Sequence, residues 1–211
     1  MSAARQRRRG WVIATLVVGA ALLAFTLGLE PGNDLFLVAG FAMAAVWAGG
    51  ALLSGPMPPG NGDMSLARAL ALGTGVGAFL LGGCLVVALF VAEVPVLREP
   101  AEALLEHADG GTLLPVFVMT AVGGVGEEMF FRGALYDALP QHLAIVVTTV
   151  VYTLTTVGSA VFLLVVAAAM LGAVTAVLRQ RTGGLAAPIA THLMWSLGML
   201  LLLPHALATG R

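Results

Sequence analysis

The chain carries very little charge. Only 10% of its 211 residues are charged, none of them is lysine, and 59% are hydrophobic, whereas a soluble domain typically has about 25% charged residues. The mean hydropathy is +0.99. These values exclude a water-soluble globular fold. Long apolar runs between short polar stretches indicate an all-α fold, a polytopic bundle of transmembrane helices.

Cysteine and basic surface are also scarce. The single cysteine, Cys84, excludes an intramolecular disulfide and a metal site built from several cysteines. The formal net charge is −1, and the one dense basic cluster consists of the arginines at residues 5–9. No basic face that would suit nucleic acid is evident. We therefore expect membrane lipid, and no nucleic acid, as a partner.

Seven segments approach the length of about 20 apolar residues that a membrane-spanning helix needs. The predicted spans are 11–29, 35–53, 69–91, 113–131, 143–157, 160–178 and 185–203. The fifth is the shortest, so it is tilted, extended into the preceding loop, or re-entrant. We divide the chain into N-terminal helices and linkers (1–112), a core (113–203) and a C-terminal tail (204–211).

The placement of arginine predicts the orientation, because cytoplasmic loops retain positive charge. The cluster at residues 5–9 puts the N-terminus in the cytoplasm. With alternating spans, Arg68, Arg132, Arg179 and Arg181 then fall on the same side. We expect a multi-pass integral protein of a prokaryotic cell membrane with a cytoplasmic N-terminus.

Ionisable side chains inside apolar spans are costly, and by default they mark functional sites. Glu127, Glu128 and Arg132 lie near the end of the fourth predicted span. Glu128 and Arg132 are one turn apart on one helical face, whereas Glu127 projects about 100° away. The arginine can therefore hold Glu128 and leave Glu127 available as a general base. A purely structural Glu–Arg pair at a helix end would leave Glu127 without a partner.

His192, in the last predicted span, is the second costly residue. At about 1.5 Å of rise per residue, Glu127 lies roughly 21 Å below the outer start of its helix and about 9 Å from the inner boundary. His192 lies roughly 10 Å from that same boundary. We therefore expect the two side chains to meet in a shared wet pocket, to which Ser196, one turn after His192, can supply a hydroxyl.

The sequence around these residues resembles a known family. The string Glu127-Glu128-Met-Phe-Phe-Arg132-Gly is similar to the EExxxR motif of the CPBP family of intramembrane proteases, which is named for CAAX proteases and bacteriocin-processing proteins and is also called Abi. Residues 181–192 (RTGGLAAPIATH) resemble the last conserved segment of that family. The resemblance covers about residues 113–203 and implies a CPBP-like C-terminal catalytic core.

The resemblance implies intramembrane proteolysis by an endopeptidase of the type II CAAX protease kind, a hydrolase that acts on a membrane-delivered peptide or protein, lipidated or not. It implies that Glu127 activates water and that Glu128 and Arg132 support it. It also implies that His192 polarises the scissile carbonyl or its oxyanion.

Two positions depart from the family pattern. The FxxxH motif aligns with residues 152–156, where Thr156 replaces the histidine, and Ser196 replaces the asparagine one turn after the last histidine. At roughly 20 Å from the inner boundary, Thr156 lies too deep, so either its helix begins later or the alignment is wrong.

Zinc is the cofactor to consider, and no other is expected. With one intramembrane histidine, the ligand set falls short of the three protein ligands common in catalytic zinc sites, so metal dependence is doubtful. Without a metal, His192 and Ser196 would donate to the developing oxyanion.

Two other functions stay open. The lost histidine suits a catalytically weak or inactive relative that serves as a membrane binding, immunity or assembly protein. The charge of Glu127 and Glu128 also allows a transporter in which these residues form a proton or cation site. No other feature supports it, because neither repeat symmetry nor paired broken helices is evident.

Overall fold

The computed structural model describes residues 3–58, 60, 62–106, 113–159 and 161–209, and this part of the chain is helical and contains no strand. The predicted all-α class is confirmed. The helices are α1 (Ala3–Leu27), α2 (Leu35–Ser54), α3 (Leu66–Val91), α4 (Pro95–Leu105), α5 (Leu113–Glu128), a π-helix (Met129–Leu135), α6 (Tyr136–Ala138), α7 (Gln141–Thr156), a 3₁₀-helix (Val157–Ser159), α8 (Phe162–Thr182) and α9 (Ala186–Thr209).

Seven of the described helical segments are long and apolar enough to cross a membrane, as predicted. They are Gln6–Leu27, Leu35–Ser54, Leu66–Val91, Leu113–Ala138, Gln141–Ser159, Phe162–Thr182 and Ala186–Thr209. The predicted boundaries at residues 112 and 160 lie outside the described residues. The last helix continues past the predicted end at residue 203 to Thr209.

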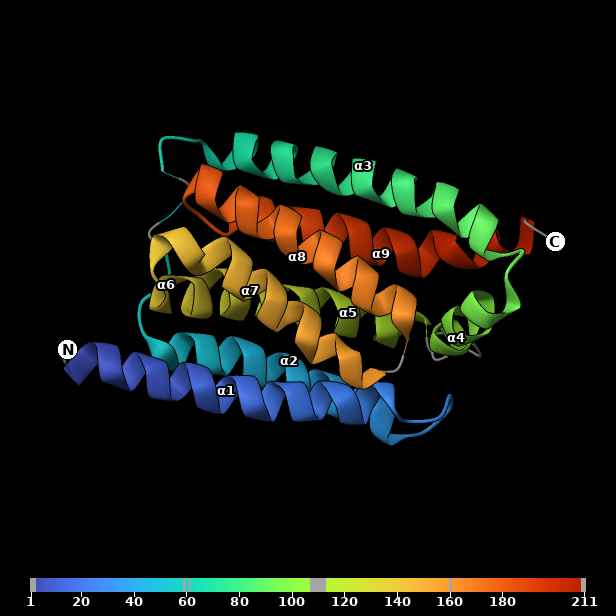
Figure 1. Ribbon diagram of the computed structural model, residues 1–211, viewed down its shortest axis with the longest axis horizontal. Helices are drawn as coiled ribbons and strands as arrows, with labels where there is room; N and C mark the ends of the chain where they lie inside the picture. Colours follow the sequence, from blue (N-terminus) through green and yellow to red (C-terminus); the bar gives the residue numbers. More distant parts are fainter. Residues whose placement is uncertain (1–2, 59, 61, 107–112, 160, 210–211) are drawn as a thin grey trace.

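Two helix pairs flank a central group of helices (Figure 1). α1 packs along α2, which packs on α5, and at the opposite side of the bundle α3 packs along α9. α7 and α8 pack together, and α8 and α5 also contact α9. The chain begins at one end of the bundle and finishes at the other (Figure 1). We call the end where α1 begins the N-terminal end.

The fourth span is seven residues longer than predicted. It does not stop at Phe131 but runs without a break from α5 through the π-helix into α6, which ends at Ala138. The fifth span is extended into the preceding loop, one of the three alternatives for this short segment. α7 begins at Gln141, directly after Pro140.

Close contact between α3 and α9 depends on glycine. Gly73 and Gly77 are buried on the face of α3 that meets α9, and a Cβ atom on Gly77 would lie 2.7 Å from the carbonyl oxygen of Thr191. Small residues four positions apart allow the helix backbones to approach this closely in lipid. The Thr191 hydroxyl then donates to the carbonyl oxygen of Gly73 at 2.9 Å.

An aromatic cluster fills the core between the π-helix, α2 and α7. Trp47 of α2 lies 4.9 Å from Phe130 and 5.0 Å from Phe131, measured between ring centroids. All three side chains are fully buried, and Phe131 also contacts Tyr152 of α7 at 4.8 Å. Because both phenylalanines belong to the π-helix, this packing fixes the position of the neighbouring charged residues.

Candidate functional site

The acid pair lies where the α-helix changes to a π-helix. Glu127 and Glu128 are the last two residues of α5, and Arg132 lies within the π-helix. π-helical turns are rare and frequently occur at functional sites. No proline interrupts this stretch, although Gly126 and Gly133 lie on either side of the charged residues, and the π-helix was not predicted.

Glu128 and Arg132 form a buried ion pair, as their spacing predicted. Arg132 Nη1 lies 3.1 Å from Glu128 Oε1, and neither side chain is exposed. Arg132 also donates from Nη2 to the carbonyl oxygen of Gly172 in α8 at 3.0 Å, and its guanidinium lies 4.7 Å from the centre of the Tyr152 ring. Buried charges persist only when they are paired and hydrogen-bonded in this way.

His192 of α9 contacts both acids. Its Nδ1 lies 2.8 Å from Glu128 Oε1, and its Nε2 lies 3.9 Å from Glu127 Oε2. Because a carboxylate only accepts hydrogen bonds, Nδ1 carries the proton in the shorter contact and donates it to Glu128. The convergence of the acid pair and the imidazole, expected from their depths, is confirmed.

Glu127 is the acid outside the ion pair. Its side chain is 14% exposed, whereas that of Glu128 is fully buried. The hydroxyl of Tyr152 donates to Glu127 Oε2 at 2.8 Å. One oxygen of Glu127 is thus oriented by Tyr152 and faces His192, in a setting where a carboxylate can accept a proton.

Tyr152 is a site residue that the sequence reasoning missed. A usable signal was its depth, since Tyr152 follows the start of α7 by eleven residues and Glu127 precedes the end of α6 by eleven. The hydroxyl of Thr156, the last residue of α7, donates to the carbonyl oxygen of Thr153 at 2.8 Å. α7 begins two residues earlier than predicted, and not later. Of the two alternatives for the depth of Thr156, the one that remains is that the FxxxH motif does not align with residues 152–156.

Ser196 is on α9, one turn after His192, as predicted. Its hydroxyl is buried and has no hydrogen-bond partner among the described residues. The structure therefore leaves a buried donor beside the histidine but does not connect it to either acid.

The donor set does not fit a metal ion. Among the described residues, no group of three His, Cys, Asp or Glu side chains is placed to hold one. His192 Nδ1 and Glu128 Oε1 are engaged with each other, and Arg132 shares that carboxylate. Glu128 Oε2 is buried without a hydrogen-bond partner among the described residues. Glu127, Glu128 and His192 are nevertheless not placed as a set that could hold a metal ion, and catalytic zinc sites commonly have three protein ligands.

A second polar network fastens the far end of the π-helix to α8. Arg179 donates from Nε to the carbonyl oxygen of Arg132 at 2.9 Å and from Nη2 to Asp137 Oδ1 at 3.0 Å. Its guanidinium also lies 5.1 Å from the centre of the Tyr136 ring. From the sequence, Arg179 was used only to predict the orientation of the chain in the membrane, and its role in holding the π-helix was not predicted.

Two cavities lie at the N-terminal end of the bundle, with volumes of about 500 and 480 Å³. Neither is lined by Glu127, Glu128 or His192. The shared wet pocket expected for these residues thus stays a prediction. The observation that indicates access of water to the site is the partial exposure of the Glu127 side chain.

Residues 109–198 match a family model described as type II CAAX prenyl endopeptidase Rce1-like. No curated protein and no solved structure matches the chain. The matched segment runs from just before α5 into α9, and it includes the acid pair, Arg132, Tyr152 and His192.

Proposed function

We propose that this integral membrane protein is an intramembrane endopeptidase, because residues 109–198 match the model of the Rce1-like type II CAAX prenyl endopeptidase (CPBP/Abi) family. Residues 113–203 are its catalytic core. Its substrate is a membrane-delivered peptide or protein, lipidated or not, and Glu127 is the base that activates water. The observation that carries the proposal is the pairing of Glu128 with Arg132, which leaves Glu127 partly exposed and 3.9 Å from His192.

In the proposed reaction, the Glu127 carboxylate takes a proton from water as the water oxygen bonds to the carbonyl carbon of the scissile peptide. The carbonyl electron pair moves to the oxygen and forms an oxyanion. When this intermediate collapses, the C–N bond breaks and Glu127 returns the proton to the leaving amine nitrogen. One water is consumed, and the base is regenerated.

His192 is the donor to the oxyanion. With Nδ1 donating to Glu128, Nε2 is the ring nitrogen from which a doubly protonated imidazole can donate to the oxyanion. Ser196 supplies a further hydroxyl from the next turn of α9.

Tyr152 and Arg132 are positioning residues in this proposal. The Tyr152 hydroxyl orients Glu127 Oε2 and leaves Oε1 for the water. Arg132 holds Glu128, which in turn sets the ring position and the protonated nitrogen of His192. No step of the proposed reaction uses zinc, because no group of three His, Cys, Asp or Glu side chains in the described part of the chain is placed to hold it.

The test uses the full chain, purified and reconstituted in liposomes with a panel of lipidated and transmembrane peptides, and mass spectrometry identifies the products. Glu127→Gln should lower the cleavage rate by about 10²–10⁴-fold, the usual contribution of a general base. Glu93→Gln, at an exposed acid after α3, is the matched control and should leave the rate unchanged. Cleavage by Glu127→Gln at the wild-type rate would refute the assignment.

A second candidate function is a catalytically weak or inactive relative that acts as a membrane binding, immunity or assembly protein. Among the described residues, His192 is the one histidine that contacts the acid pair, and a site with a single histidine favours this alternative. Peptides from the same panel that bind the wild-type chain but are never cleaved would support this alternative.

The arginine distribution supports an orientation with the N-terminal end of the bundle in the cytoplasm of a prokaryotic cell. The catalytic core would then open toward the cytoplasmic half of the membrane. Labelling of single cysteines introduced at Gly10 and at Gly32, in a Cys84→Ala background, would test which end is accessible from the cytoplasm.

A further inference from the structure

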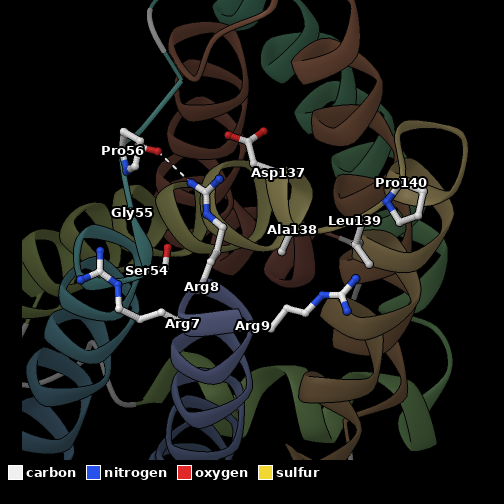
Figure 2. A pocket seen from close by; sticks show the side chains of 10 residues that line it. All are labelled: Arg7, Arg8, Arg9, Ser54, Gly55, Pro56, Asp137, Ala138, Leu139 and Pro140. Atoms are coloured by element: carbon white, nitrogen blue, oxygen red, sulfur yellow. Dashed lines mark hydrogen bonds between the residues drawn. The ribbon is translucent and has the colours of Figure 1, made fainter. Parts of the chain in front are cut away.

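The larger of the two cavities, about 500 Å³, is not used by the proposed reaction. It lies at the N-terminal end of the bundle, between the beginning of α1, the end of α2 and the turn from α6 to α7 (Figure 2). Three consecutive arginines, Arg7, Arg8 and Arg9, line it.

The lining carries an excess of positive charge. Among the described residues that line it, the one carboxylate is Asp137, which already lies 3.0 Å from Arg179 Nη2. Guanidinium groups bind phosphate through paired N–H donors in a planar fork. The cavity therefore suits an anion with several acceptor oxygens.

Arg8 is held in place at the centre of the cavity. Its Nη2 donates to the carbonyl oxygen of Pro56 at 2.8 Å, and its side chain extends between Pro56 and Asp137 (Figure 2). Gly55 has φ 149°, and a Cβ atom there would lie 3.4 Å from Arg8 Nε. That Nε is buried without a hydrogen-bond partner among the described residues, so an acceptor beside it would satisfy a costly donor.

The surroundings favour an anion that carries an apolar tail. Arg9, Ile13 and Val17 follow one another at four-residue spacing, so they lie along one face of α1, and the last two are 62% and 64% exposed. Leu139 and Pro140 form an apolar part of the cavity lining beside Arg9 (Figure 2). A phosphate at the arginines would thus have a path for acyl chains along α1.

We propose that this cavity binds the phosphate of an anionic phospholipid headgroup, with an acyl chain along the Ile13 and Val17 face of α1. Basic pockets between transmembrane helices bind anionic headgroups in this manner. The proposal is independent of the proposed protease activity, because it uses none of the residues assigned to the reaction.

The test measures binding of short-chain lipids to the full chain in a zwitterionic detergent, from the rise in the midpoint of thermal unfolding. Dioctanoyl-phosphatidylglycerol should bind at least about ten-fold more tightly than dioctanoyl-phosphatidylcholine. Arg8→Gln should weaken phosphatidylglycerol binding about five-fold, the equivalent of the roughly 1 kcal/mol that a basic residue contributes near an anionic lipid. Arg8→Lys should retain more of the binding than Arg8→Gln.

Arg68→Gln is the matched control, because Arg68 lines the other cavity at the same end of the bundle. It should leave lipid binding unchanged, and an equal loss in Arg68→Gln and Arg8→Gln would overturn the proposal. Equal affinity for the two lipids would also overturn it. Inorganic phosphate that binds as tightly as phosphatidylglycerol would overturn it as well, because that result would indicate a site for free anions. If Arg8→Gln does not fold, Arg9→Gln and the wild-type comparison of the two lipids decide the question.

Discussion

Replacing Arg132 by methionine should strongly destabilise the protein. The change removes the guanidinium that lies 3.1 Å from the carboxylate of Glu128 and donates to the carbonyl oxygen of Gly172. It leaves the buried carboxylate of Glu128 without its guanidinium partner, and breaking a buried ion pair in this way typically costs about 3–5 kcal/mol. For a chain of this length, 1 kcal/mol corresponds to roughly 2–4 °C in the unfolding midpoint, so we expect a fall of about 6–20 °C.

The assay is thermal unfolding of the purified chain in detergent, followed by tryptophan fluorescence. Arg181→Met, at an exposed arginine near the same end of the bundle, is the control and should change stability by no more than about 0.5 kcal/mol. The double variant Glu128→Gln with Arg132→Met should recover part of the loss, because the uncompensated carboxylate is gone. A midpoint for Arg132→Met equal to that of Arg181→Met would refute the reasoning, as would a double variant no more stable than Arg132→Met alone.

Three further perturbations test other parts of the structure. Tyr152→Phe removes a hydrogen bond to a carboxylate and should lower the rate of peptide cleavage about 10–100-fold, with a small change in the unfolding midpoint; an unchanged rate would remove Tyr152 from the site. Gly77→Leu should lower the free energy of unfolding by about 1–3 kcal/mol or more, because the side chain forces α3 away from α9. Gly75→Leu, where a Cβ meets open space, should unfold at the wild-type midpoint. Similar midpoints for the two variants would contradict the close packing of α3 on α9. Arg179→Gln should cost about 1.5–3 kcal/mol in the same thermal assay, through its lost hydrogen bonds to a carbonyl and a carboxylate, and a loss below about 0.5 kcal/mol would show that Arg179 does not fasten the π-helix.

The seven spans were predictable because the requirement for a long apolar segment is local. Each apolar run can be recognised without knowing its neighbours. The end of the fourth span was not predictable in the same way. The predicted span ended before Arg132 because a charged side chain inside a membrane-spanning helix is costly. In the structure, Gly172 and Arg179 of α8 are among the partners that stabilise Arg132 and Asp137. These partners are distant in sequence, so no local pattern identifies them.

The candidate site was predictable in part. Spacing placed Glu128 beside Arg132, and depth placed His192 near the acids, because both follow from the regular rise and turn of a helix. The role of Tyr152 depends on which way its side chain points from α7, and this is set by the packing of α7 against the π-helix. The π-helix itself has no signature in the sequence, so the local geometry of the acid pair required the structure.

Each hydrogen-bonded ring in the π-helix spans one residue more than a ring of an α-helix. Losing one residue between Met129 and Leu135 would therefore let this stretch become α-helical while the flanking turns keep their rotational phase. In an ordinary α-helical span, the same deletion would turn all following side chains by about 100°. A one-residue deletion here would thus separate folding from activity. The helical bundle should still assemble, whereas peptide cleavage should be lost.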